Sequence, residues 1–317
     1  MLSVLDIFRI GIGPSSSHTV GPIRIGKKFV DDLRAKNLLA DTARIEVRFR
    51  GSLAFTGVGH ATPKAAVLGL LGLEPETLDP VTADGQVAKA YNDNTLLLGG
   101  ETAIAFNAET DLVLDFQTPA DLHPNEMAVA AFDKNGAETL SEIYYSTGGG
   151  FIASKAQLET PLPDDIVRTG ASVPYEFSSA DELLAFCAQE NASIADIILA
   201  NEDAVRPRAE TDAALDRIAD VMMACIERGL STKGILPGGL NVKRRAPSIW
   251  EKLHDAAPSN EREQLFDWLN VYAMAVNEEN AAGGQVVTAP TNGAAGIIPA
   301  IIKHYCLGEG TDINRKN

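Results

Sequence analysis

The residues best suited to chemistry stand close together near the amino terminus. Gly13-Pro14 is followed directly by Ser15-Ser16-Ser17-His18-Thr19, so four hydroxyl groups and one imidazole share a single reversal of the chain. Imidazole changes its charge near neutral pH, and hydroxyls both donate and accept hydrogen bonds. A helix beginning near Val20 would point its free backbone N–H groups at the same place, which suits a carboxylate or a phosphate. The alternative is a serine-rich turn in which one hydroxyl caps the helix.

A second candidate lies in the segment Thr56-Gly57-Val58-Gly59-His60-Ala61-Thr62. His60 follows a predicted strand and precedes a predicted helix. Loops in that position often carry catalytic groups because the flanking elements hold them rigidly. The alternative is a structural histidine bonded to the backbone. Asn125 is a weaker candidate, since it follows a proline and Pro-Asn is common in turns.

Two polar stretches near the carboxyl end complete the set of candidates. Asn277-Glu278-Glu279-Asn280 closes an apolar helix predicted over 265–282. This stretch fits an exposed last turn, although acids there oppose the helix dipole. Thr291-Asn292-Gly293 precedes another apolar helix, and its hydroxyl and amide suit either a bound carboxylate or amine, or a helix cap.

Composition limits the classes of partner and the cellular compartment. The chain has 317 residues, 45% of them hydrophobic, and a net charge of −16, so neither nucleic acid nor an anionic membrane is expected as a partner. No apolar run approaches the ~18–20 residues of a membrane span, and charge interrupts the first residues before a signal-peptide core. Cys187, Cys225 and Cys306 are too widely spaced for a zinc or iron–sulfur motif, and an odd, scattered set suits a reducing cytoplasm. Cys187 and Cys225 fall in apolar helix stripes, which favours buried thiols.

The elements that must position these residues change character near residue 154. Before it, the patterns predict an α/β mixture, and after a linker of prolines and acids they predict helices only. Ser179 starts a helix, Gly229 is the expected C-cap of a long amphipathic one, and Pro247 suits a first helical position. Periodicity and turn residues give these segments: helices over 20–36, 65–73 and 209–228, a strand over 43–50, and a hairpin of 127–133 with 138–146 around Asn135-Gly136.

The order of the motifs resembles the iron–sulfur L-serine dehydratases, also called L-serine ammonia-lyases. The resemblance runs from about residue 3 to His304 and rests on five stretches: Gly-Pro-Ser-Ser-Ser-His-Thr-Val-Gly-Pro, Thr-Gly-x-Gly-His-x-Thr, Tyr-Tyr-Ser-x-Gly-Gly-Gly-Phe from Tyr144, Leu236-Pro237-Gly238, and Asn-Glu-Glu-Asn-Ala-Ala-Gly-Gly through Ala-Pro-Thr-Asn-Gly-Ala. It implies an α+β chain. Residues 1–153 would form a mixed α/β domain similar to allosteric amino-acid-binding domains, 154–178 a linker, and 179–317 the amino-terminal portion of an all-α catalytic domain.

The resemblance also implies an activity, the conversion of L-serine to pyruvate and ammonia without pyridoxal phosphate. In the family, a [4Fe-4S] cluster with one open iron acts as a Lewis acid on the serine hydroxyl, and a histidine removes the α-proton. The matching positions give acid–base work to His18 and His60. Eight further positions match residues near the substrate: Ser15, Ser16, Ser17, Thr19, Thr62, Asn125, Thr291 and Asn292. The relatives suggest a cytoplasmic homodimer.

One departure from the family bears on the cofactor. The match fades after His304-Tyr305, and the family's cluster cysteines lie beyond that point. The resemblance therefore implies a chain truncated at its carboxyl end, with no metal ligand of its own. Pro63 stands where many relatives carry an acid, which removes an acid beside His60. Three interpretations stay open: a shortened serine dehydratase, a non-catalytic amino-acid-binding protein, and a half-enzyme whose partner chain supplies the cysteines.

Overall fold

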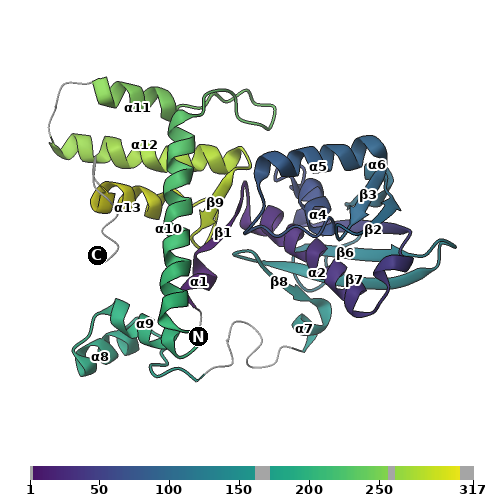
Figure 1. The fold of residues 1–317 in the computed structure, drawn as a ribbon, viewed down its shortest axis with the longest axis horizontal. Helices are drawn as coiled ribbons and strands as arrows, with labels where there is room; N and C mark the ends of the chain where they lie inside the picture. Colours follow the sequence, from purple (N-terminus) through teal and green to yellow (C-terminus); the bar gives the residue numbers. More distant parts are fainter. Residues whose placement is uncertain (1–2, 161–171, 256–260, 308–317) are drawn as a thin grey trace.

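A computed structural model describes residues 3–160, 172–255 and 261–307, with the side chains of 261–264 excepted. A part built around a five-stranded sheet lies beside a part built of helices (Figure 1). The predicted α+β class is therefore confirmed at this level. Each part has its own core, since one cluster of buried side chains fills the sheet part and a second fills the helical part.

The sheet has the strand order β5-β2-β6-β7-β8. Strand β5 runs parallel to β2, and the other neighbours are antiparallel. The alternating segment predicted as a strand is the central β2, and the predicted hairpin is the pair β6–β7, so both predictions are confirmed. The strands of this sheet are β2 (Arg44–Gly51), β5 (Leu112–Asp115), β6 (Asn125–Phe132), β7 (Glu138–Gly148) and β8 (Phe151–Ser154).

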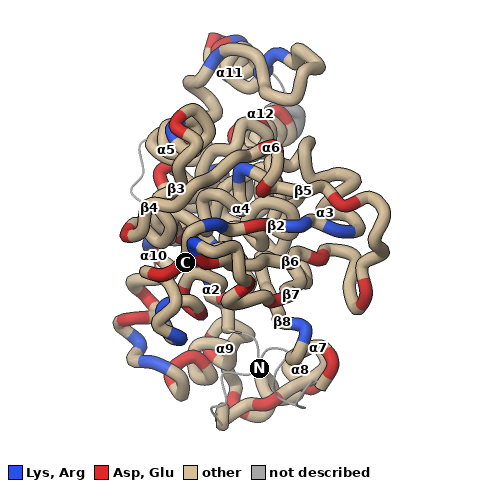
Figure 2. Tube along the Cα trace, turned by 90° about the vertical axis from the view of Figure 1, so that its right-hand side faces the viewer, with Lys and Arg blue, Asp and Glu red and all other residues tan. Residues whose placement is uncertain are grey.

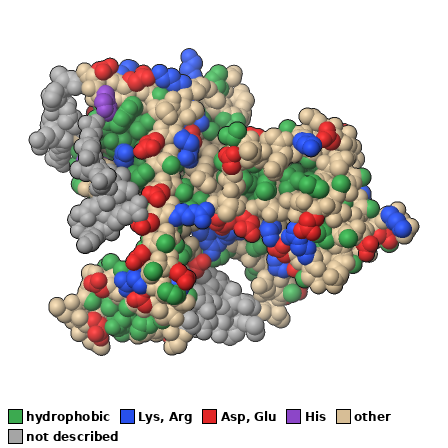
Figure 3. Space-filling view, in the orientation of Figure 1, with side chains coloured by type: hydrophobic (Ala, Val, Ile, Leu, Met, Phe, Trp, Pro, Cys, Tyr) green, Lys and Arg blue, Asp and Glu red, His purple; other side chains and the backbone are tan. Residues whose placement is uncertain are grey.

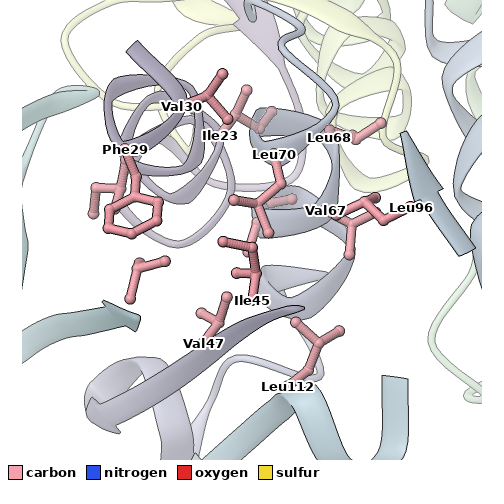
Figure 4. Close-up of a cluster of buried hydrophobic side chains, with 14 of the residues drawn as sticks. Ile23, Phe29, Val30, Ile45, Val47, Val67, Leu68, Leu70, Leu96 and Leu112 are labelled. Carbon is pink, nitrogen blue, oxygen red and sulfur yellow. The ribbon is translucent and has the colours of Figure 1, made fainter. Parts of the chain in front are cut away.

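Helices α2 (Gly21–Ala35) and α4 (Thr62–Leu70) cover one face of this sheet. Apolar side chains of both helices meet those of β2 in the core (Figure 4). The two helices touch closely because both carry glycine at the crossing: a Cβ on Gly69 would lie 2.0 Å from the Ile23 carbonyl oxygen. The charged residues of β2 alternate with its buried apolar residues, and they appear as blue and red stretches along this strand (Figure 2). Among them, Glu46 pairs with both Arg44 and Arg48.

Shorter elements complete the sheet part. Helix α5 leads into a second, two-stranded antiparallel sheet formed by β3 and β4. One turn of helix, α7, lies in the segment predicted as a linker, whose residues 161–171 are outside the described ranges. The bounds are α3 (Ser52–Phe55), α5 (Pro80–Asp93), β3 (Thr95–Leu98), β4 (Thr102–Ala105), α6 (Ala108–Asp111), α7 (Lys155–Glu159) and a 3-10 turn at Leu39–Asp41.

The helical part is arranged around the long helix α10, which packs on α12 and α13 (Figure 1). The prediction that Gly229 ends this helix is wrong, because the helix continues to Ser231. Gly229 instead allows close packing: a Cβ there would lie 2.3 Å from the Ala275 carbonyl oxygen of α12. The helices are α8 (Ala180–Glu190), α9 (Ile194–Asp203), α10 (Arg208–Ser231), α11 (Ala246–Asp255), α12 (Glu261–Ala281) and α13 (Ile297–Leu307).

Helices α8 and α9 form a bent pair at one end of α10 (Figure 1). Ser179 is the N-cap of α8, as predicted, with its hydroxyl accepting from the Glu182 N–H. Within the described ranges no single helix is long and apolar enough to cross a membrane. The pair α8–α9, bent by 92°, passes that test together on length and composition alone.

The first residues of the chain join the helical part. Strand β1 (Arg9–Ile12) pairs antiparallel with β9 (Gln285–Thr288), between the two parts of the molecule (Figure 1). Helix α1 (Val4–Ile7) is tied to α9, because Glu202 accepts hydrogen bonds from the Ser3 hydroxyl and the Val4 N–H. The pairing of β1 with β9 was not predicted. It brings the segment after β1 to the junction of the two parts, while the division at 153 and 178 stays a prediction.

Candidate active site

The serine-rich segment forms a π-helical turn, Ser16–Val20, that continues directly into α2. Helix α2 begins at Gly21 with Val20 as its N-cap, so the predicted start near Val20 is confirmed. The π turn before it was not predicted, and it places His18 in a helical turn rather than in a loop. Ser15 is the N-cap, and its hydroxyl accepts from the His18 N–H at 3.2 Å. Single π turns are rare and occur often at functional sites. The capping alternative is thus confirmed, while the binding of a carboxylate or phosphate at this turn stays a prediction.

Hydroxyl groups hold both ring nitrogens of His18. Its Nδ1 lies 2.8 Å from the Ser17 Oγ, and its Nε2 lies 2.9 Å from the Ser52 Oγ. Burial, followed by repulsion from His60, lowers the pKa of His18 below its ordinary value of 6.5, although the contact with Ser52 opposes this shift. The ring is therefore neutral at pH 7, with one nitrogen donating and the other accepting.

The second histidine lies against the first. The ring centroids of His18 and His60 are 4.9 Å apart, with the planes tilted by 44°. The Nδ1 of His60 lies 2.9 Å from the Thr56 carbonyl oxygen. A carbonyl only accepts hydrogen bonds, so Nδ1 of the neutral ring carries the proton and Nε2 keeps a free electron pair. This tautomer is the one that a general base acting through Nε2 requires.

Two threonines connect the histidine segments reciprocally. The Thr19 hydroxyl donates to the His60 carbonyl oxygen at 2.8 Å, and the Thr62 hydroxyl donates to the His18 carbonyl oxygen at 2.7 Å. Thr62 is fully buried, and Thr19 nearly so. Both hydroxyl protons are thus committed to the protein, and the two threonines position the histidines in this structure.

Two asparagines of the carboxyl-terminal stretches bond to the backbone just before the π turn, at Ile12 and Pro14. Asn292 accepts from the Thr288 hydroxyl at 2.7 Å and donates to the Ile12 carbonyl oxygen and to the Asn280 side chain. Asn280 in turn donates to the Pro14 carbonyl oxygen at 3.0 Å. Asn292 therefore fixes Ile12 directly and the Gly13-Pro14 turn through Asn280.

The two acids of the Asn-Glu-Glu-Asn stretch, Glu278 and Glu279, are buried, so the interpretation of this stretch as an exposed last turn is wrong. Glu278 accepts from the backbone N–H groups of Arg245 and Ala246, at the start of α11. Glu279 pairs with Arg228 and Arg244. Each carboxylate therefore has cationic or N–H partners that offset its burial.

Two predicted substrate contacts lie at the edge of this arrangement. Asn125 is buried, donates to the Ser146 carbonyl oxygen at 3.0 Å, and pairs across the sheet with Gly51, next to Ser52. Thr291 is exposed, and α13 begins only at Ile297, so the stretch Thr291-Asn292-Gly293 does not form the start of that helix. The structure thus gathers His18, His60 and the hydroxyls of Ser15, Ser17, Thr19 and Thr62, with Ser16 buried in the same turn.

Sequence reasoning missed Ser52 and gave Asn280 no role. Ser52 follows the last residue of β2, and side chains at strand ends often reach functional sites. That position was the available signal. The contact of Asn280 with Pro14 had no local signal, because the two residues meet only after β1 pairs with β9.

The thiols do not form a metal site. Within the described ranges, no group of three or more His, Cys, Asp or Glu side chains is placed to hold a metal ion. Burial raises the pKa of the Cys225 thiol to about 12, which keeps it protonated. Cys187 lies on α8 and Cys306 on α13. These residues do not fit the three-cysteine ligand set of an iron–sulfur cluster.

Comparison with known proteins supplies the context of this site. Residues 3–157 match the family model described as "Serine dehydratase beta chain", and residues 189–311 match "Serine dehydratase alpha chain". The chain belongs to the serine dehydratase family. Among its relatives are the L-serine dehydratase of Streptomyces coelicolor, 45% identical over 304 residues, and that of Haemophilus influenzae, 42% identical over 307 residues. L-serine dehydratase 1 of Escherichia coli is 43% identical over 308 residues.

Each of these alignments covers 96% of this chain and 66% of the relative. This member of the serine dehydratase family therefore spans about two thirds of the length of the relatives that it matches. The matched residues include both histidine segments and both asparagines that support the Gly13-Pro14 turn. The resemblance to serine dehydratases expected from the motifs is thus confirmed.

Proposed function

We propose that this chain takes part in the conversion of L-serine to pyruvate and ammonia. The observation that carries the proposal is the pair of imidazoles, His18 and His60, whose ring centroids lie 4.9 Å apart beside the hydroxyl-lined π turn. The printed names of the relatives support serine as the substrate. The mixed class of the sheet part is compatible with an amino-acid-binding domain, and a cytoplasmic homodimer belongs to the same proposal.

The substrate carboxylate is held at the start of the π turn. Ser15, Ser16 and Ser17 surround that end of the helix, where the first N–H groups and the helix dipole favour an anion. Hydrogen bonds from hydroxyls to a carboxylate are charge-assisted, so each contributes about 1.5–3 kcal/mol. This anchoring places the α-carbon of serine near the two imidazoles.

His60 removes the α-proton through Nε2. The bond of its Nδ1 to the Thr56 carbonyl fixes the required tautomer. His18, kept neutral and held between two hydroxyls, is the second acid–base group of the site. Loss of the α-proton and of the β-hydroxyl gives aminoacrylate, which tautomerises to the imine and hydrolyses to pyruvate and ammonia.

The family's [4Fe-4S] cluster would supply the Lewis acid for the departing hydroxyl. Because the described residues do not fit its ligand set, no step of the reaction is assigned to a cluster held by this chain. We propose that the cluster cysteines come from a continuation of the polypeptide or from a second chain. No pyridoxal phosphate enters this scheme.

The test is pyruvate formation from L-serine under anaerobic conditions. The chain is purified alone and together with the remaining third of the S. coelicolor relative, expressed as a separate polypeptide. Activity is expected in the two-chain complex and not in the chain alone. In the complex, His60→Ala should lower kcat about 10²–10⁴-fold with its iron content unchanged. Ser16→Ala should act mainly by raising KM.

The control is His254→Ala, which removes a histidine of α11 that lies against Trp250. This variant should keep the kcat of the unaltered complex. A complex that holds about four irons per pair of chains and forms no pyruvate would contradict the proposed function. Near-normal kcat in His60→Ala would show that His60 is structural and leave His18 as the base.

A further inference from the structure

A separate cavity of about 410 Å³ lies where the sheet part meets the helical part. Its charged lining residues are Asp6, Arg9, Arg24, Glu76 and Arg217. They come from α1, β1, α2, the segment before α5, and α10. Figure 3 shows basic and acidic side chains gathered along this junction. The cavity shares no lining residue with the His18–His60 site.

The balance of charge in this cavity is positive. Three arginines face two acids there, in a chain whose net charge is −16. Arg9 pairs with Asp6 at 2.8 Å, and Arg24 pairs with Glu76. Arg217 donates to the Glu76 carbonyl oxygen at 3.2 Å, and no ion pair of Arg217 with a lining acid is seen in the described part of the chain. The third guanidinium therefore brings a positive charge that the two acids, already paired with Arg9 and Arg24, do not offset.

The two paired arginines also repel each other. The guanidinium of Arg9 is half-buried and lies 3.8 Å above the Phe151 ring. Burial, followed by repulsion from Arg24, lowers the pKa of Arg9 in spite of its bond to Asp6. Arg24 is fixed by a second bond, from its Nη1 to the Gly150 carbonyl oxygen at 2.8 Å. An anion in the cavity would relieve this repulsion without displacing either pair.

We propose that this cavity binds a carboxylate that carries a short apolar chain. Guanidinium groups match carboxylates geometrically, because two parallel N–H groups meet two oxygens. The rest of the wall is apolar and includes Phe8, Ile10 and Ile218, which suits an alkyl substituent. Arg24 belongs to the sheet part and Arg217 to the helical part, so such a ligand bridges the two. Since Arg9 lies in β1, the ligand also contacts the strand that leads into the Gly13-Pro14 turn.

The test is isothermal titration calorimetry of the full chain with acetate, butyrate and inorganic phosphate at constant ionic strength. Butyrate should bind tightest, and about 15-fold tighter than acetate, because each buried methylene contributes about fourfold. Arg217→Gln should weaken butyrate binding about tenfold, as expected for the loss of a charged donor. The matched control is Arg208→Gln on the same helix, where the arginine pairs with Asp203 outside the cavity. The affinity of this variant for butyrate should be unchanged.

A second control separates this site from the serine site. Ser16→Ala, which weakens serine binding under the proposed function, should leave butyrate binding intact. Equal affinities of Arg217→Gln and Arg208→Gln, or the absence of binding heat with butyrate, would overturn the proposal. Tighter binding of phosphate than of butyrate would overturn it too, because the apolar wall would then have no part in selection. Arg9→Gln gives an independent variant, with the same loss expected as for Arg217→Gln.

Discussion

Replacing Thr62 by valine should loosen the connection between the two histidine segments. Valine keeps the shape of threonine and removes the hydroxyl that donates to the His18 carbonyl oxygen at 2.7 Å. Thr62 is fully buried, so water cannot replace this donor. Leaving a buried acceptor without a partner costs about 1–3 kcal/mol of unfolding free energy. We expect a loss in this range for Thr62→Val.

The assay is urea unfolding followed by far-UV circular dichroism, with stability taken from the midpoint at unchanged slope. Thr56→Val is the matched control, because this exposed threonine makes the same kind of bond, from its hydroxyl to the Ser52 carbonyl oxygen at 2.9 Å. Water replaces that bond when it is lost, so the control should change stability by no more than about 0.5 kcal/mol. Thr62→Ser keeps the donor and should recover most of the loss.

A double-mutant cycle then tests reciprocity. Thr19 makes the mirror-image bond to the His60 carbonyl oxygen, so Thr19→Val and Thr62→Val should be coupled by about 0.5–3 kcal/mol. Equal stabilities for Thr62→Val and Thr56→Val would refute the reasoning, since burial would then make no difference. Strict additivity of the two buried variants would show that the two bonds act independently.

Three further predictions follow from the same geometry. In an NMR titration His18 should show a pKa below 6.5, and His60→Gln should raise that pKa only part of the way, because burial is the larger cause of the shift and repulsion the smaller. As the pH falls below about 6.5, the unfolded chain therefore takes up the His18 proton before the folded chain does. The free energy of unfolding should accordingly fall with pH from about 6.5 down to the folded pKa, and it should fall less steeply in His18→Gln. The chain alone should bind no stable [4Fe-4S] cluster, so anaerobic reconstitution should give no broad absorbance near ~400 nm, and a brown protein with about four irons per chain would contradict this. Gly229→Ala should destabilise the helical part by about 1–3 kcal/mol in the urea unfolding assay, because its Cβ would meet the Ala275 carbonyl oxygen. Gly85→Ala, with open space around it in the middle of α5, should be neutral or stabilising in the same assay.

Local patterns carried the prediction of the larger elements. The alternation of β2 and the Asn135-Gly136 turn between β6 and β7 are signals that neighbouring residues contain in full. Gly229 shows where such reasoning fails, because its role depends on a carbonyl group of another helix. A glycine near the end of an amphipathic pattern looks the same whether it ends a helix or allows one to pack closely.

The site shows the same limit. His18, His60 and their hydroxyl neighbours were identified from residue types, and the motif order placed the chain in its family. The pairing of β1 with β9 could not be predicted, because each strand has four residues and the partners lie far apart in the sequence. Consequently the contacts of Asn280 with Pro14 and of Asn292 with Ile12 could not be predicted either. The π turn was missed since nothing in the segment distinguishes it from an α-helical start.

The most direct test of the central claim is an NMR titration of this chain with L-serine, following the imidazole resonances of His18 and His60. Both sets of resonances should shift together with one dissociation constant, and Ser16→Ala should weaken that constant about tenfold, as expected for one charge-assisted hydrogen bond. His123 and His254 should not move. Two results would show that the paired imidazoles do not form the serine site. One is a set of shifts confined to His123. The other is the absence of a shift at His18 and His60 at serine concentrations that calorimetry shows to saturate binding.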